Sequence, residues 1–173
     1  ITRRSWRDPC RNMQRAKLFR QKKTCVKLWR KACRHVKNKI IDTNVIIRFL
    51  MESPGSIQKK IAGVYSFFEK LERKDISADL PELVLFEAFF VLTGYYEIPQ
   101  NTAAEKLSEI VLFSGIEMPD KVLILSCLDT LKKKKVGLVD AYIYVLSKKY
   151  GNSEVYSFDS DLKKLGLSLA HIG

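Results

Sequence analysis

The feature that most constrains the fold of this chain is an alternation of short apolar runs with longer segments of helical periodicity. The runs with strand character cover residues 39–44, 76–78, 115–118, 154–158 and 167–169. Short strands separated by helices of about ten residues or more predict a parallel α/β sheet with helices on both faces. Ligands of such sheets bind beyond the carboxyl ends of the strands, so we expect the functional residues there.

Helical periodicity places the helices between these strands. They are expected through residues 45–50, 57–71, 83–96, 102–113, 119–135 and 141–150, with Gly151 ending the last one. Residues 83–96 are apolar almost throughout, so we expect a deeply buried helix in which the charge of Glu87 needs a partner. The sequence Thr102-Ala103-Ala104-Glu105 has the pattern of a capping box and predicts a helix start.

The positive charge of the chain is concentrated in its first part. The formal net charge is +12, yet residues 1–39 hold 15 Lys and Arg residues and a single acid, Asp8. Residues 40–173 hold 16 basic and 18 acidic residues and have the size and apolar content of one domain. We therefore divide the chain into a basic extension, residues 1–35, and a functional domain, residues 36–173.

Three hypotheses account for the basic extension. It is a helix that binds an acidic partner, RNA or an anionic surface through its Arg and Lys residues. Alternatively, it is a disordered segment. The third hypothesis is that it does not belong to the natural gene product, because Val36 could correspond to an alternative start codon.

Cysteine content and hydropathy bear on the location of the protein. Four Cys residues in a chain of this size do not make a disulfide framework, which favours the reducing cytoplasm. Three of them lie in the extension without any Cys-x-x-Cys pair, so incidental thiols are favoured over a zinc site. No run approaches the roughly 18 apolar residues of a membrane span. We expect a cytoplasmic protein that does not act in membranes.

Four carboxylates stand where such a sheet gathers functional groups. Asp42 and Asp159 each follow a strand, Asp140 begins a helix, and Glu87 lies within the apolar helix. Asp42 and Asp159 could instead be turn or cap residues, and Asp140 could serve only to stabilise the helix dipole. None of the four has a cationic partner nearby in sequence, so a divalent cation is the economical counter-charge. Oxygen-only ligands favour Mg²⁺ or Mn²⁺ over Zn²⁺.

Four motifs, in this order, resemble those of PIN-domain ribonucleases. They are Ile40-Ile41-Asp42-Thr43-Asn44-Val45, Leu83-Val84-Leu85-Phe86-Glu87, Val139-Asp140-Ala141 and Ser157-Phe158-Asp159-Ser160-Asp161. The similarity spans about residues 36–173 and is closest to the VapC-type toxins of type II toxin-antitoxin systems. The hydrophobic-Asp-Thr-Asn opening is its most specific part.

The resemblance implies a three-layer α/β/α sandwich with a central parallel sheet of four to five strands. It implies metal-dependent cleavage of single-stranded RNA with Asp42, Glu87, Asp140 and Asp159 as catalytic acids. Asp42, Asp140 and Asp159 would bind Mg²⁺ or Mn²⁺, with Asn44, Ser157 and Asp161 in support. The metal would lower the pKa of a bound water, so that no protein nucleophile is needed. A cognate antitoxin and a homodimer are implied as partners.

One position departs from the pattern of the resemblance. Many relatives carry a further acid two or three residues before the third one, where this chain has Gly137 and Leu138. We expect this departure to change metal affinity or metal number and to leave activity in place. The run Lys132, Lys133, Lys134 and Lys135 just before it could hold RNA phosphates, or it could be a solvated helix end.

Two further functions stay open at the level of sequence. One is a PIN nuclease that acts in RNA processing without an antitoxin, which genomic neighbourhood would distinguish. The other is a catalytically silent module that binds RNA or protein through the basic extension. Survival of RNA affinity after deletion of residues 1–35 would count against that last function.

Overall fold

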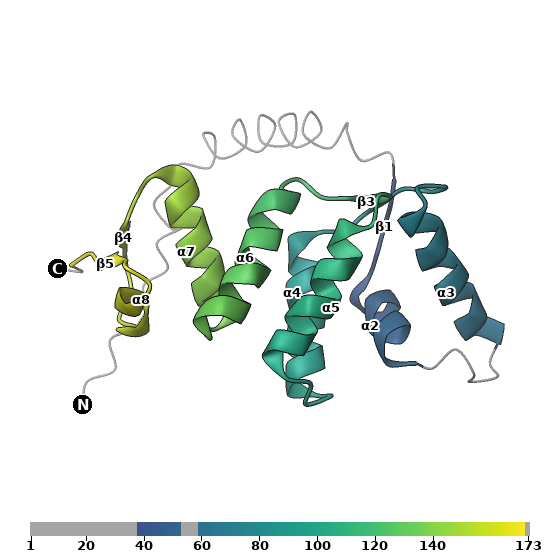
Figure 1. The fold of residues 1–173 in the computed structure, drawn as a ribbon, viewed down its shortest axis with the longest axis horizontal. Coiled ribbons are helices and arrows are strands. Elements are labelled where there is room, and N and C mark those ends of the chain that lie inside the picture. The colour runs from purple at the N-terminus through teal and green to yellow at the C-terminus, as the bar shows by residue number, and fades with distance from the viewer. Residues whose placement is uncertain (1–37, 53–58, 172–173) are drawn as a thin grey trace, which may run out of the picture. The chain divides into compact units, whose positions relative to one another are not determined.

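The computed structural model describes residues 38–52 and 59–171 of the chain (Figure 1). All of them belong to one unit that begins at Asn38. The hypotheses on the basic extension lie outside the described residues, and so does the start of the helix expected from residue 57.

Three short parallel strands form one sheet of the described unit. Strands β1 (Lys39–Ile40), β2 (Ala78–Asp79) and β3 (Ile116–Glu117) pair in the order β1-β2-β3. Lys39 lies opposite Ala78, and Ala78 lies opposite Ile116. The backbone N–H of Ile41 extends the pairing by donating to the carbonyl of Asp79 at 2.9 Å. β1 is an edge strand of this sheet, and Ile40 is 63% exposed.

A second parallel sheet follows near the end of the chain. Strands β4 (Glu154–Val155) and β5 (Ser168–Leu169) pair with each other, and the short helix α8 (Asp161–Lys164) connects them. The parallel α/β arrangement is confirmed, but a single central sheet of four to five strands is not, since the described strands divide between two sheets. The strand expected through residue 158 ends at Val155, and Tyr156 and Phe158 are exposed.

The described residues also form six longer helices. They are α2 (Thr43–Met51), α3 (Lys59–Glu72), α4 (Glu82–Gly94), α5 (Gln100–Leu112), α6 (Lys121–Lys134) and α7 (Leu138–Tyr150). Each matches a helix expected from periodicity, and Gly151 ends α7 at a φ of 66° as predicted. None of the described helices is long and apolar enough to cross a lipid bilayer.

Two helix starts differ from the sequence prediction. The capping box at Thr102 is wrong, because α5 begins two residues earlier, at Gln100, directly after Pro99. Pro99 is the N-cap residue, and its carbonyl accepts from the N–H of Ala103 at 3.0 Å, which closes the first turn of the helix. The start of α6 is capped by Asp120, whose carboxylate accepts from the N–H of Leu123 at 3.0 Å.

The helices and the β1-β2-β3 sheet enclose one continuous core. Its largest fully buried side chains include Ile46, Phe68, Leu85, Phe89, Leu107 and Ile124. A separate small cluster of Leu162, Leu165 and Leu167 supports α8 and β5. Cys127 belongs to the main core, and burial raises the pKa of its thiol to about 12, so this thiol stays protonated.

Helix α4 is buried on one face only, which corrects the expectation of a deeply buried helix. Leu85, Ala88, Phe89 and Leu92 face the core. Leu83 is 78% exposed, Phe90 is 51% exposed, and Glu87 is exposed between them in sequence. Because these three residues recur at helical spacing, they share the outer face. Glu87 is therefore not the isolated buried charge that the sequence indicated.

Candidate active site

The first group of candidate residues lies at the carboxyl end of β1. Asp42 follows the strand and precedes α2, yet its carboxylate accepts no hydrogen bond from the helix backbone. It accepts instead from the side-chain amide of Asn44, at 2.6 Å between Oδ2 and Nδ2. Asp42 and Asn44 are both exposed. The Asp-Thr-Asn motif thus presents a carboxylate that a neighbouring amide orients toward solvent.

Glu87 joins this group from α4. The hydroxyl of Thr43, a residue only 8% exposed, donates to Oε2 of Glu87 at 2.5 Å. This bond connects positions 44 residues apart in the chain. The sequence analysis expected a partner for the charge of Glu87, and this partner is the neutral hydroxyl of Thr43. A hydrogen bond to a carboxylate is stronger than one between neutral groups, so it holds Glu87 beside Asp42.

These residues line a cavity of about 460 Å³ between α2 and α4. Its walls are formed by Asp42, Thr43, Asn44, Ile47, Arg48, Glu52, Glu87, Val91 and Tyr96. One carboxylate oxygen of Glu52 is buried, and no residue of the ranges 38–52 and 59–171 forms a hydrogen bond with it. In the described part of the chain, the cavity lining therefore combines three carboxylates with the cation of Arg48 and the aromatic ring of Tyr96.

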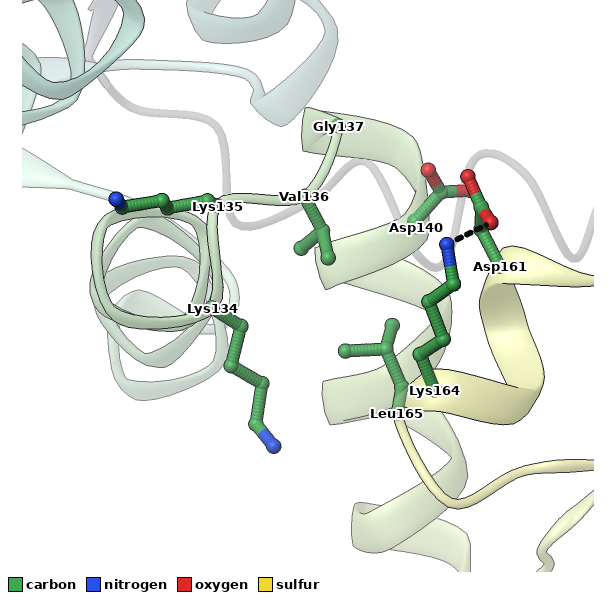
Figure 2. Close-up of a pocket in the computed structure, with 8 residues that line it drawn as sticks. All are labelled: Lys134, Lys135, Val136, Gly137, Asp140, Asp161, Lys164 and Leu165. Atoms are coloured by element: carbon green, nitrogen blue, oxygen red, sulfur yellow. Dashed lines mark ion pairs between the residues drawn. The ribbon is translucent and has the colours of Figure 1, made fainter.

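The second group of candidate residues lies where α7 meets α8. Asp140, in the first turn of α7, and Asp161, the first residue of α8, line a cavity of about 330 Å³. Figure 2 shows both carboxylates facing this space, with the ammonium group of Lys164 reaching Asp161. The N–O distance of that ion pair is 2.7 Å, and the bond raises the pKa of Lys164.

Ser157, Asp159 and Asp161 form a chain of local hydrogen bonds. The hydroxyl of Ser157 accepts from the N–H of Asp159 at 3.0 Å, and Oδ1 of Asp159 accepts from the N–H of Asp161 at 2.8 Å. One oxygen of Asp159 therefore has the turn role that the sequence left open. Its other oxygen has no hydrogen-bond partner among the described residues. The support of Asp159 by Ser157 and Asp161 in a metal site stays a prediction.

The lysine run has a mixed environment. Lys133 pairs with Asp129 at 2.8 Å, whereas Lys134 and Lys135 line the cavity of Asp140. In Figure 2 their side chains extend away from the two carboxylates. The ammonium group of Lys134 lies 5.1 Å from the centre of the Tyr144 ring, in a cation–π contact.

The structure thus divides the four expected catalytic acids between two places. Asp42 and Glu87 share one cavity, while Asp140 lines another together with Asp161, two residues after Asp159. Among residues 38–52 and 59–171, no three carboxylate, His or Cys side chains form a metal-binding group. Assignment of all four acids to one site remains a prediction.

The two groups are linked through Tyr142. Its hydroxyl, on α7, donates to Oε2 of Glu82 on α4 at 3.2 Å, and its ring packs edge-on against Phe86 at 5.3 Å. Burial and the nearby charge of Glu82 raise the pKa of Tyr142, so the hydroxyl stays protonated and donating. Helices that carry Glu87 and Asp140 are therefore in direct contact.

Sequence reasoning missed several residues that the structure places at these cavities. Thr43 holds Glu87, Arg48 and Tyr96 line the first cavity, and Lys164 pairs with Asp161. For Arg48 a signal was present, because it lies one helical turn beyond Asn44 and therefore on the same face. The contact of Thr43 with Glu87 had no signal in either segment alone.

The donor chemistry of both cavities suits a hard divalent cation. Every candidate ligand offers oxygen, from Asp, Glu, Asn or Ser side chains, and the described lining of both cavities contains neither His nor Cys. Mg²⁺ is commonly held by only one or two carboxylates and keeps several waters. Asp42 and Glu87 are two carboxylates that line one cavity.

Gly137 is packed close to the carboxylate of Asp140. A Cβ atom at this position would lie 3.0 Å from Oδ2 of Asp140. A side chain at this position would therefore press directly against the carboxylate of Asp140, and glycine avoids that contact.

The family assignment agrees with this arrangement. The profile of the PIN domain matches residues 39–167, which is most of the chain and includes both groups of acids. The chain belongs to the PIN-domain family. No curated protein matches it with significant sequence similarity. PIN domains are generally metal-dependent nucleases, so membership supports a nuclease that acts on RNA.

Proposed function

We propose that this protein is a Mg²⁺- or Mn²⁺-dependent endoribonuclease that cleaves single-stranded RNA. The observation that carries the proposal is the pairing of Asp42 and Glu87 in one open cavity, oriented by Asn44 and Thr43. Two exposed carboxylates held by hydrogen bonds, at the carboxyl end of a parallel strand, are suited to an external ligand. The PIN-domain match supports the same reaction.

In the active enzyme, Asp140 and Asp159 complete the site with Asp42 and Glu87. Asp42, Asp140 and Asp159 would hold the metal, and Asn44, Ser157 and Asp161 would keep the carboxylates in place. The bound metal would supply a water of lowered pKa and stabilise charge on the phosphate in the transition state. The protein residues orient the phosphate and the attacking water, so the reaction requires no covalent intermediate.

The four acids meet if β4 pairs with the free edge of β1, giving one sheet of up to five strands. Among the described strands β1 is an edge strand, and because the N–H of Ile41 bonds to β2, alternation directs the peptide groups of Ile40 to the other side. A two-stranded sheet is marginal on its own, and Tyr156 and Phe158 after β4 are 78% and 91% exposed. Parallel pairing of β4 with β1 would bring Asp159 beside Asp42.

RNA phosphates would contact the lysine run near Asp140. Lys134 and Lys135 line that cavity, and Lys132 and Lys133 precede them on the last turn of α6. Cationic contacts with phosphates supply most sequence-independent affinity for nucleic acids. This supports a substrate path that passes the end of α6.

We further propose that the nuclease is the VapC-type toxin of a toxin-antitoxin pair, acting in the cytoplasm. The support is the Asp-Thr-Asn opening with its three companion motifs, in the order seen in those toxins. A cognate antitoxin would neutralise it by covering or distorting the acidic site. Co-expression with the product of a neighbouring gene, followed by growth of the host, tests this role.

A homodimer is the expected assembly. The outer face of α4 carries Leu83, Phe90 and Tyr95 around an apolar cavity of about 820 Å³. An exposed apolar face of this kind is typical of a protein contact. Sedimentation of the purified protein, compared with a Phe90→Glu variant, tests the dimer separately from catalysis.

Cleavage of mixed-sequence single-stranded RNA tests the nuclease. The wild type with Mn²⁺ or Mg²⁺ should cleave, and EDTA should abolish cleavage. Asp42→Asn should reduce the rate at least about 100-fold, because it removes a charge from the metal and leaves the fold intact. Asp75→Asn is the matched control, since Asp75 is exposed in the turn after α3. Cleavage by Asp42→Asn at the control rate would exclude the proposal.

A further inference from the structure

We infer that the cavity between α2 and α4 is a subsite for one nucleotide of the RNA chain, in which Arg48 binds a phosphate and Tyr96 stacks on a base. This inference deepens the proposed function and rests on it. It assigns substrate binding to two residues that the metal and acid chemistry does not use.

Arg48 is placed to reach a phosphate beside the catalytic carboxylates. On α2 it lies one turn after Asn44, and both residues line the cavity of Asp42 and Glu87. Its side chain is exposed, and it forms no ion pair with any residue of the described part of the chain. A guanidinium group can bind two phosphate oxygens at once.

The charge of the cavity supports this role. Among the described residues that line it are three carboxylates, from Asp42, Glu52 and Glu87, and the guanidinium group of Arg48. An RNA phosphate that approaches the carboxylates is repelled by them unless cations compensate. A metal ion at the carboxylates and Arg48 at the opposite end of the α2 face would hold the phosphate between two positive groups.

Tyr96 provides a stacking surface at the same cavity. It follows α4, it is 39% exposed, and its backbone N–H donates to the carbonyl of Val91 at 3.2 Å. The ring packs edge-on against Tyr95, with ring centres 4.9 Å apart. This contact holds the ring while leaving part of it open. Single-stranded RNA binds proteins largely through bases stacked on such rings.

The two residues together define what the cavity would bind. A cation and an aromatic ring on the walls of one cavity match the phosphate and the base of one nucleotide. The cavity volume of about 460 Å³ is within the range of small-ligand sites. Position next to Asp42 and Glu87 makes it the subsite adjacent to the bond that is cleaved.

Binding of a short fluorescein-labelled single-stranded RNA tests the inference separately from catalysis. Anisotropy is measured in Ca²⁺, a hard cation with the same preference for oxygen ligands, while a gel monitors cleavage. Arg48→Met should weaken binding about tenfold. The negative slope of log affinity against log salt should become less steep by about 0.7, which corresponds to one lost phosphate contact. Arg73→Met is the control, because Arg73 is exposed after α3 and lines none of the three cavities.

Tyr96→Leu should also weaken binding about tenfold, without a change in the salt slope, whereas Tyr96→Phe should stay within about twofold of wild type. Equal affinities of Arg48→Met and Arg73→Met would overturn the inference. So would the absence of RNA binding by the wild type, or a Tyr96→Leu variant that changes oligomeric state with unaltered RNA affinity. If the wild type binds RNA with these variant effects but does not cleave it with Mg²⁺ or Mn²⁺, the proposed nuclease activity is contradicted while the nucleotide-binding site is supported.

Discussion

The cavity of Asp42 and the cavity of Asp140 are built in different ways. Around Asp42, two helices pack on a continuous core, and the bond from Thr43 to Glu87 joins distant parts of the chain. Around Asp140 and Asp161, the hydrogen bonds and the ion pair of α8 connect residues two or three positions apart. The first geometry is set by tertiary packing, while much of the second is set by local turns. A local turn orients its carboxylate but does not position it against a distant one.

Tyr142 joins the two regions, because its side chain on α7 contacts Glu82 and Phe86 on α4. Of the substitutions predicted below, its removal should have the largest effect on stability. Tyr142→Ala should lower the free energy of unfolding by about 2 kcal/mol, because it removes the ring contact with Phe86 and the bond to Glu82. Tyr142→Phe should lower it by about 1 kcal/mol. Urea unfolding measures both. Equal stability of Tyr142→Ala and wild type would show that the Tyr142 contact between α7 and α4 does not stabilise the fold.

The same residue gives a pH dependence. Because burial and Glu82 raise the pKa of Tyr142, the neutral hydroxyl is favoured in the folded state. Its contribution is fully present below the unfolded pKa of about 10 and is lost as the pH rises above that value. The stability difference between wild type and Tyr142→Phe should therefore shrink above pH 10. A difference that grows with pH would contradict the assignment.

Thr43→Val tests the hydrogen bond that holds Glu87 at the cavity of Asp42. The substitution keeps the shape of a buried side chain and removes only the donor to Glu87, so the free energy of unfolding should fall by about 1 kcal/mol. RNA cleavage should fall about tenfold, because Glu87 is no longer held. Thr43→Ser retains the hydroxyl and serves as the control. A Thr43→Val enzyme as active as Thr43→Ser would show that this bond has no role in catalysis.

Lys164→Met should have the smallest effect. Lys164 and Asp161 are both exposed, and exposed ion pairs contribute little to stability. The urea midpoint should match that of Lys163→Met, a neighbouring exposed lysine without an ion pair in the described structure. A clear loss of stability in Lys164→Met alone would mean that the Asp161 turn depends on this pair.

The sequence predicted the succession of strands and helices well, because local periodicity and residues such as Gly151 act within a few positions. It also placed Asp42 after β1 and Asp140 in the first turn of a helix. It misjudged Glu87, because α4 is apolar on nearly all sides and periodicity cannot tell which side faces the core. Strand pairing, the Thr43 bond and the Arg48 and Tyr96 cavity all join distant segments, which no local pattern records.

A double-mutant cycle tests most directly whether the Asp42 and Asp140 regions form one metal-dependent site. RNA cleavage with Mn²⁺ is measured for wild type, Asp42→Asn, Asp140→Asn and the double variant. If both acids serve one site, each single variant should lose at least about 100-fold in rate, and the double variant should lose little more. Near wild-type cleavage by either single variant, or losses that multiply in the double variant, would contradict a shared site.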